Sequence, residues 1–303
     1  KALKTILVKR FGTVQFEEGN DLSYLGMQIS IRNTGTIVSM SFYVQQVLEG
    51  QSVAVKLSPG TKTTFVVNEM SPALGEKERK VFHSQTAKVL YLAKRARPDI
   101  LTVVSFLCTR VQSATEEDRS KLDRVLGYLK GTQDRTLLLR AQSTCLVTAY
   151  VDAAFGLHND SRSHSGVVVF VGGTLAYVSS KKQKCMSKSP TEAELIALTD
   201  NLGLVELFRE LVSFLTMSQV PMPIVYQDCT AVITLVTKGG GITRTKHLRV
   251  RMNLGKEMVD EKRVRVEYVK AAGMIADGFS KPYDPAEHKP FAAVVQGEAT
   301  IGK

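Results

Sequence analysis

The 303-residue chain has no tryptophan, five histidines and four cysteines. The cysteines stand 37 to 44 residues apart, so no two have the short spacing of zinc ligands, and nothing resembles a disulfide framework. We therefore expect reduced thiols in an intracellular, reducing compartment, either the cytoplasm or the nucleus, with an organelle not excluded. No apolar run approaches the roughly 20 residues of a membrane-spanning helix, so we predict neither a membrane protein nor a membrane partner.

Several familiar catalytic motifs are also absent. The sequence contains no glycine-rich loop ending in Gly-Lys-Ser or Gly-Lys-Thr, and no serine in a nucleophile elbow. The chain begins at Lys1 rather than at Met, and its first residues lack the apolar core of a secretory signal. We expect a processed or truncated piece of a longer protein that uses none of these chemistries.

Basic residues outnumber acidic ones, at 40 Lys+Arg against 29 Asp+Glu, which gives a net charge of +11. Residues 1–140 hold 21 basic and 13 acidic residues, whereas residues 141–303 hold 19 and 16, so most of the excess lies in the first half. Such an excess favours a polyanionic partner, nucleic acid first. A basic protein that its charge keeps soluble fits the same numbers about equally well.

The first 140 residues combine a hairpin signal with helical patterns. Two β-rich runs flank Asn33-Thr34-Gly35 within residues 22–41, which predicts a hairpin. Proline and glycine in residues 56–81 predict a long irregular connection. Helices are predicted from apolar periodicity and start signals at 42–51, 82–97, 98–107 and 115–131. Lys121, Arg124 and Lys130 lie on the edges of the last helix, as either a nucleic-acid backbone clamp or a solvated helix surface.

The second half alternates strands and helices. Strands are predicted at 145–151, 166–172, 174–180, 223–226 and 264–269. Helices are predicted at 191–215, 229–237 and 248–261, with a short one near residue 272. This order of antiparallel hairpins and helix-separated strands predicts an α/β domain with a mixed sheet and helices packed on it.

Four carboxylates stand where a structural carboxylate is not expected. Asp152 and Asp228 come at or just past the ends of strands, Glu194 lies in the first turns of the long helix, and Asp277 lies on the short last helix. A single acid at a helix start is usually a surface residue, but four in one sheet domain are better explained as a converging cluster. Such a cluster repels itself unless cations fill it, and carboxylate oxygens suit Mg²⁺ or Mn²⁺. Two such ions catalyse phosphodiester hydrolysis in known enzymes.

An ordered series of motifs extends this interpretation. The series comprises YLGMQIS (24–30), LYLAKRARPDI (90–100), TEEDRSKLDRVLGYLKGT (115–132), YVDAAFG (150–156), SPTEAELIAL (189–198), YQDCTAVI (226–233), TRTKHLRVRMN (243–253) and VEYVKAAGMIADGFSKP (266–282). From residue 150 onward it resembles the ribonuclease H domain of copia-type LTR-retrotransposon Pol polyproteins. The upstream motifs resemble the palm end, thumb and connection of the reverse transcriptase of the same family, so the likeness covers roughly residues 10–283.

The resemblance implies a fold and a division of the chain. The implied fold is a ribonuclease H-like five-stranded mixed sheet with flanking helices, preceded by a mostly helical thumb and connection segment with an N-terminal β-hairpin. The implied parts are the palm end (1–41), the thumb and connection (42–140) and the ribonuclease H domain (141–283). Residues 284–303 match no motif, and we expect them to form a loose tail.

The resemblance also implies a reaction. Asp152, Glu194, Asp228 and Asp277 match the four catalytic acids, and Glu194 is preferred to Glu192 because it precedes the family's hydrophobic-x-Ala pattern. The implied activity is cleavage of the RNA strand of an RNA–DNA hybrid with two Mg²⁺ or Mn²⁺ ions per site. The polymerase motif would lie upstream of Lys1, so no DNA synthesis is expected. The implied partners are the hybrid or another nucleic acid, and the missing polymerase part or a larger complex.

Further basic and histidine residues allow more than one interpretation. Lys181, Lys182 and Lys184 form a run that either holds a phosphate backbone or protects a solvated edge strand. The same choice applies to the segment with Arg244, Lys246 and His247, which either approaches the hybrid or caps and packs the following helix. The remaining histidines include His158 and His164, which we expect to be solvated in a polar loop.

Two other functions stay open. A Pol-derived fragment without catalysis would act as a structural or nucleic-acid-binding subunit of a larger assembly. Another ribonuclease H-like nuclease, such as an integrase, is disfavoured because its glutamate lies on a late helix, whereas Glu194 precedes the third acid.

Overall fold

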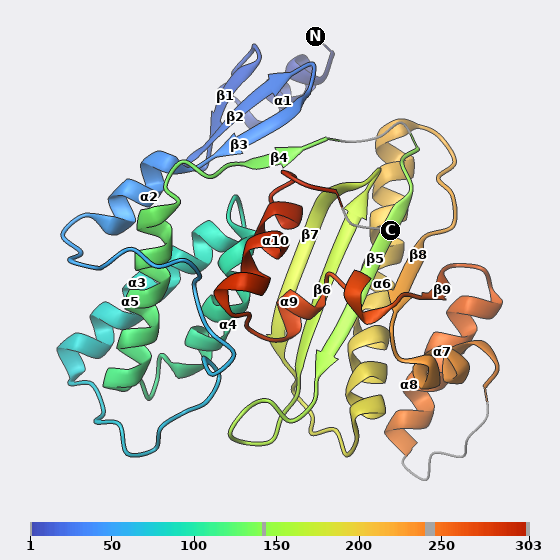
Figure 1. Ribbon diagram of the computed structural model, residues 1–303. Helices are drawn as coiled ribbons and strands as arrows, with labels where there is room; N and C mark the ends of the chain where they lie inside the picture. Colours follow the sequence, from blue (N-terminus) through green and yellow to red (C-terminus); the bar gives the residue numbers. More distant parts are fainter. Residues whose placement is uncertain (1, 141–143, 240–245, 301–303) are drawn as a thin grey trace.

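The structure is a computed structural model that describes residues 2–140, 144–239 and 246–300. Its centre is a five-stranded sheet in the order β7-β6-β5-β8-β9 (Figure 1). The strands are β5 (Val147–Ala154), β6 (His164–Val171), β7 (Thr174–Lys182), β8 (Ile224–Gln227) and β9 (Arg265–Tyr268). β5, β6 and β7 are antiparallel, whereas β8 and β9 run parallel to β5. The predicted mixed sheet is therefore confirmed.

Local sequence explains why this sheet forms. The run Val167–Val171 in β6 is apolar at every position because helices cover both faces of the sheet there. Gly172 and Gly173 both have positive φ, at 56° and 76°, and they make the tight turn between β6 and β7. A helix then connects β7 to β8, which leaves β8 parallel to β5.

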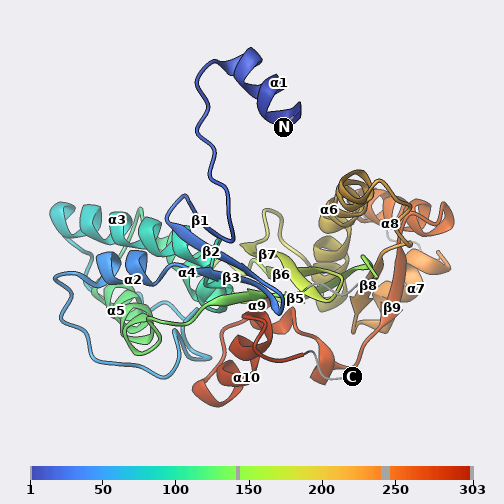
Figure 2. The same ribbon diagram turned by 90° about the horizontal axis from the view of Figure 1, so that it is seen from above.

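Different sets of helices cover the two faces of the sheet (Figure 2). One face carries α6 (Pro190–Thr216), α7 (Thr230–Thr237) and α8 (Lys246–Asp260). The other carries the short helix η2 (Ala271–Gly273), α9 (Asp277–Ser280) and α10 (Pro285–Val295). In the described ranges, no helix combines the length and the apolar character that a bilayer crossing needs.

A helical region precedes the sheet and packs against its β7 edge. It comprises α2 (Ser41–Leu48), α3 (Glu76–Ala93), η1 (Pro98–Ile100), α4 (Leu101–Arg110) and α5 (Glu116–Gly131). The predicted start of α5 is confirmed, and there the side chains of Thr115 and Asp118 cap the helix reciprocally. The hydroxyl of Ser105 on α4 donates to the carbonyl of Ser180 on β7 at 2.5 Å, so the two regions are joined by hydrogen bonding as well as by packing.

The N-terminal strands differ in part from the expectation. β1 (Asp21–Tyr24), β2 (Met27–Arg32), β3 (Gly35–Ser39) and the later β4 (Leu137–Leu139) form a four-stranded antiparallel sheet. The predicted hairpin across Asn33-Thr34-Gly35 is present, but the expected single run before it is split by a turn at Leu25-Gly26. Both turn residues have positive φ, and leucine is a weak signal for that conformation. The helix α1 (Ala2–Phe11) stands apart from the rest (Figure 2).

The prediction of a loose tail after residue 283 is wrong for the described residues. α10 begins behind a capping box at Asp284 and lays Phe291 against Phe279, with ring centroids 5.1 Å apart. His288 and Gln296 are buried and donate toward Asp99 in the helical region. The apolar positions that dock this helix lie outside the recognised motifs, which is why the sequence pattern missed them.

One hydrophobic cluster crosses the expected boundary near residue 140. It contains Phe106 from α4, Tyr150 and Val168 from the sheet, and Phe291 from α10. A second cluster lies between the sheet and α6, α7 and α8. The helical region and the sheet are therefore packed through shared core residues. The four cysteines form no disulfide bond with one another.

A buried ion pair lies where the helical region meets α10. Arg97 is 1% exposed. Its guanidinium donates one hydrogen bond to each carboxylate oxygen of Asp99, at 3.0 and 2.9 Å. Tyr128 and Gln296 donate to the same carboxylate at 2.8 and 2.9 Å. Burial alone would raise the pKa of Asp99, but the charge and hydrogen bonds of Arg97 outweigh burial and lower this pKa to about 2. This carboxylate is fully compensated.

Candidate active site

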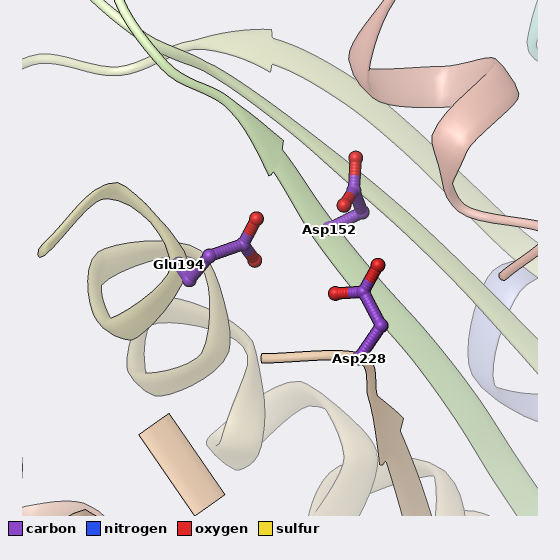
Figure 3. Close-up of side chains that lie close together, drawn as sticks. All are labelled: Asp152, Glu194 and Asp228. Atoms are coloured by element: carbon purple, nitrogen blue, oxygen red, sulfur yellow. The ribbon is translucent and has the colours of Figure 1, made fainter. Parts of the chain in front are cut away.

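Three carboxylates meet at the junction of β5, β8 and α6 (Figure 3). The parallel register pairs Tyr150 with Tyr226, which brings Asp152 and Asp228 to matching positions two residues further along. Glu194 extends toward them from the first turns of α6. One oxygen from each of the three carboxylates lies within 4.8 Å of the others. Asp152 is inside β5, two residues before its end, rather than at or past the end as expected.

The cluster is held by few hydrogen bonds. Ser280 donates its hydroxyl to Asp152 Oδ2. The backbone N–H of Ala153 donates to Glu194 Oε1 at 3.1 Å, and the amide of Gln227 donates to Glu194 Oε2 at 3.3 Å. Asp152 and Glu194 are 5% and 8% exposed, so both acids are largely removed from water, and within the described residues no cationic side chain bonds to either.

Burial and mutual repulsion disfavour the charged forms of these acids. Burial, followed by the charges of Asp277 and Asp228, raises the pKa of Asp152 to about 7. Burial, followed by the charge of Asp152, raises the pKa of Glu194 to about 9. Burial and Asp277 also raise the pKa of Asp228. Without added cations, this cluster therefore keeps protons that isolated carboxylates would lose.

Asp277 lies beside the three-carboxylate group but is not part of it. It is the first residue of α9, and its Oδ1 pairs with Lys281 Nζ at 2.9 Å. Its charge still raises the pKa of both Asp152 and Asp228, so it lies within electrostatic range of them. Asp277 and Lys281 also line a cavity of about 720 Å³ between η2, α9 and α10.

The donor set fits a hard divalent cation. Carboxylate oxygens are the preferred ligands of Mg²⁺ and Mn²⁺. The raised pKa values of Asp152 and Glu194 show that hydrogen bonds and the nearby charge of Lys281 offset burial and repulsion only in part, and a cation at their centre would supply the missing compensation. The structure therefore supports Asp152, Glu194 and Asp228 as candidate ligands, with Asp277 at the margin.

The predicted basic run at the end of β7 lies near this site, and one of its lysines already forms an ion pair within the chain. Across the β5, β6 and β7 registers, Ala153 pairs with Ser165, and Ser165 pairs with Lys181. Lys181 is thus two strands from the acids, about 10 Å in a sheet. Lys182 pairs with Asp160 at 2.7 Å, whereas Lys184 is exposed after the strand.

The three basic residues predicted on α5 contact their own chain. Lys121 donates to the carbonyl of Val66 at 2.5 Å and pairs with Glu117 at 3.1 Å. Lys130 donates to the carbonyl of Val53 at 2.9 Å. Arg124 donates to the hydroxyl of Ser58 at 3.3 Å. These side chains hold the irregular 49–75 segment against α5, which differs from the solvated helix surface expected as the alternative. Their role as phosphate contacts stays a prediction.

The remaining predicted basic residues are only partly described. Lys246 is exposed at the first position of α8. Arg244 lies outside the described residues, and for His247 the structure describes the helical backbone but not the side chain. The structure therefore leaves these two positions as predictions.

The expectation of solvated histidines at positions 158 and 164 is wrong. His158 and His164 are 6% and 0% exposed, with 2.9 Å between Nε2 of the first and Nδ1 of the second. The other ring nitrogen of His164 lies 2.7 Å from the hydroxyl of Ser180. Burial lowers the pKa of both histidines, so they are neutral packing residues between the sheet and the helical region.

Two residues of the site went unnoticed in the sequence. Ser280 follows Asp277 by three positions, a spacing that places both on one side of a helical turn. Gln227 is fully buried before Asp228, and its side-chain oxygen accepts from the N–H groups of Asp228 and Cys229 at 2.8 and 3.0 Å. The only available signal was an unexplained polar residue next to a candidate acid.

No family model matches this sequence. The chain is 27% identical over 292 residues to the retrovirus-related Pol polyprotein from transposon RE1 of Arabidopsis thaliana, a match that covers 95% of this chain and 20% of that protein. It is 27% identical over 271 residues to the corresponding polyprotein from transposon TNT 1-94 of Nicotiana tabacum, covering 85% of this chain and 20% of that one. The chain thus spans about a fifth of the length of these relatives.

Among solved structures, the chain is similar to a foamy viral protease-reverse transcriptase in complex with an RNA/DNA hybrid. The likeness covers 83% of this chain and 29% of that one, with 11% sequence identity and a TM-score of 0.42.

Proposed function

We infer from its likeness to the Pol polyproteins of three plant transposons that the chain belongs to the copia-type retrotransposon Pol polyproteins. From this premise we propose that its five-stranded sheet domain is a metal-dependent endoribonuclease. The proposed substrate is an RNA–DNA hybrid, of which the RNA strand is cut. The observation that carries the proposal is the convergence of Asp152, Glu194 and Asp228 within 4.8 Å at the junction of β5, β8 and α6.

The chain's own residues have distinct parts in this proposal. Asp152, Glu194 and Asp228 would hold two Mg²⁺ or Mn²⁺ ions, and Asp277 would complete the ligand set at the outer edge. Bound ions of this kind activate a water molecule and stabilise the leaving oxygen of a phosphodiester. The N–H of Ala153 and the amide of Gln227 hold Glu194 in place.

The hybrid would reach the acids along the outer side of the site. Lys181 and Lys184 are exposed near the start of α6, where a phosphate backbone would lie within reach. Contacts to 2′-hydroxyl groups would distinguish the RNA strand from DNA. Binding by such lysines depends on salt, since each phosphate contact releases a counterion.

The test is cleavage of a hybrid whose RNA strand carries a 5′ label, in Mg²⁺ and in Mn²⁺. We expect the wild-type chain to cut the RNA strand at internal positions and Asp152→Asn to lose at least about 100-fold in rate, the scale on which removing a catalytic group acts. Asp160→Asn is the matched control because Asp160 is a half-exposed carboxylate paired with Lys182. Equal cleavage by wild type and Asp152→Asn would contradict the proposal, and so would hybrid binding without cleavage in either metal.

A further inference from the structure

The helix α9 approaches the sheet unusually closely at the strand pair that carries Asp152. The residue opposite Asp152 on β6 is Gly166. A Cβ atom at this glycine would lie 2.4 Å from the carbonyl oxygen of Ala276 and 2.5 Å from the backbone nitrogen of Ser280. Any side chain at position 166 would therefore push α9 away from the sheet.

Contacts on other sides hold α9 in this position. Thr102 on α4 donates its hydroxyl to the carbonyl of Gly278 at 2.5 Å. Phe279 is fully buried and packs edge-on against Phe291 of α10. The helix is only four residues long, so its orientation is set by these neighbours rather than by its own hydrogen bonds.

This placement brings a buried hydroxyl to the central acid. Ser280 is 0% exposed, and its Oγ donates to Asp152 Oδ2. The same Oγ lies 3.1 Å from the carbonyl oxygen of Asp277, which restricts its rotation. Figure 3 shows one oxygen of Asp152 directed toward Glu194 and Asp228 and the other directed away from them.

We propose that Ser280 is the positioning residue of the metal site: it holds one oxygen of Asp152, so that the other oxygen stays directed at the point shared with Glu194 and Asp228. The inference rests on the proposed function and adds to it a residue that touches neither metal nor substrate. Without the hydroxyl, the carboxylate of Asp152 would rotate, and each binding event would have to order it again. Hydrogen-bond partners of metal ligands typically contribute 10- to 100-fold to metal affinity.

The experiment measures Mn²⁺ binding by calorimetry on the whole chain, with hybrid cleavage and thermal unfolding measured in parallel. Ser280→Ala is expected to weaken Mn²⁺ binding by about 10-fold or more and to lower cleavage at limiting metal more than at saturating metal. Ser280→Thr keeps the hydroxyl and is expected to restore most of the affinity. Ser58→Ala is the matched control, since Ser58 is equally buried and its hydroxyl donates to the carbonyl of Gly60.

The outcomes separate this inference from the function it extends. Wild-type affinity in Ser280→Ala, with or without a lower melting temperature, would overturn the positioning role while leaving the nuclease proposal intact. An equal loss in Ser58→Ala would also overturn it, because the effect would then be general destabilisation. A wild-type chain that neither binds Mn²⁺ nor cleaves the hybrid would contradict both proposals.

Discussion

Asp99 and Asp152 are both buried carboxylates, yet their surroundings are opposite. Asp99 accepts from Arg97, Tyr128 and Gln296, and its pKa is lowered to about 2. Asp152 accepts from one hydroxyl, faces two other acids of its cluster, and has a pKa raised to about 7. Both carboxylates are buried, but only the negative charge of Asp99 is balanced by a bonded cationic side chain.

This difference separates a structural carboxylate from a functional one. A buried charge that the protein itself neutralises contributes to the fold, and breaking its pairing is costly. A buried charge that lies beside another charge of the same sign destabilises the metal-free fold. Groups of this kind are common at functional sites.

The largest expected effects come from removing one charge at each site. Arg97→Met leaves Asp99 buried with the more distant Arg135, at 3.8 Å, as its cationic partner, so the free energy of unfolding should fall by about 3–5 kcal/mol. Asp152→Asn removes a repelling charge, so the free energy of unfolding should stay within about 1 kcal/mol of wild type or rise, while hybrid cleavage is lost. Urea denaturation with a parallel cleavage assay measures both. A strongly destabilised Asp152→Asn would contradict the distinction between a structural carboxylate at Asp99 and a functional one at Asp152.

Divalent metal should stabilise the protein through one site only. At 100 times its dissociation constant, Mg²⁺ would add about 2.7 kcal/mol to the free energy of unfolding by mass action. Asp228→Asn should abolish most of this gain, whereas the exposed control Asp260→Asn should keep it. Thermal melts over a range of Mg²⁺ concentrations measure the effect. An equal gain in Asp228→Asn would place the stabilising ion elsewhere.

The two sites should respond to pH with opposite signs. In metal-free protein, Asp152 and Glu194 keep protons up to about pH 7 and about pH 9, whereas the unfolded chain releases them near 3.8 and 4.5. The folded state binds more protons in that window, so this contribution to stability is full below about pH 4 and is lost as the pH rises toward 9. The contribution of Asp99 is present above pH 3.8 and is lost as the pH falls through about 2.

Denaturant titrations from pH 3 to pH 9, with and without Mg²⁺, would show this. Asp152→Asn should flatten the decline in stability at neutral and alkaline pH, and saturating Mg²⁺ should do the same in wild type. A decline that neither change alters would mean that other groups cause it.

The smallest expected effect concerns the outer partners of Asp99. Gln296→Ala removes one donor while Arg97 and Tyr128 remain, so the free energy of unfolding should fall by about 1–2 kcal/mol. The same variant should leave Mn²⁺ affinity unchanged, because the amide of Gln296 bonds Asp99 and not the acid cluster. Exposed Lys289→Ala on the same helix is the control. A change in Mn²⁺ affinity would show that the two sites are coupled.

The sequence predicted the sheet, the long helix and the helix capped by Thr115 because periodicity, glycine turns and capping residues are local signals. It also pointed to Asp152, Glu194 and Asp228, since their strands and helix could be placed in order. It missed the docking of α10 and the approach of Ser280, because both depend on contacts between segments far apart in the chain. His158 and His164 were misjudged for the same reason. Phe65 of the irregular 49–75 segment packs against both rings, and Phe106 of α4 packs against His158.

The central claim is that the uncompensated acids are a divalent cation site. Its most direct test is an anomalous-scattering map from crystals of this chain grown or soaked in Mn²⁺. We expect anomalous peaks between the carboxylates of Asp152, Glu194 and Asp228, and no peak at Asp99. Crystals saturated with Mn²⁺ that show no peak among the three carboxylates, or a peak only at other residues, would contradict the account.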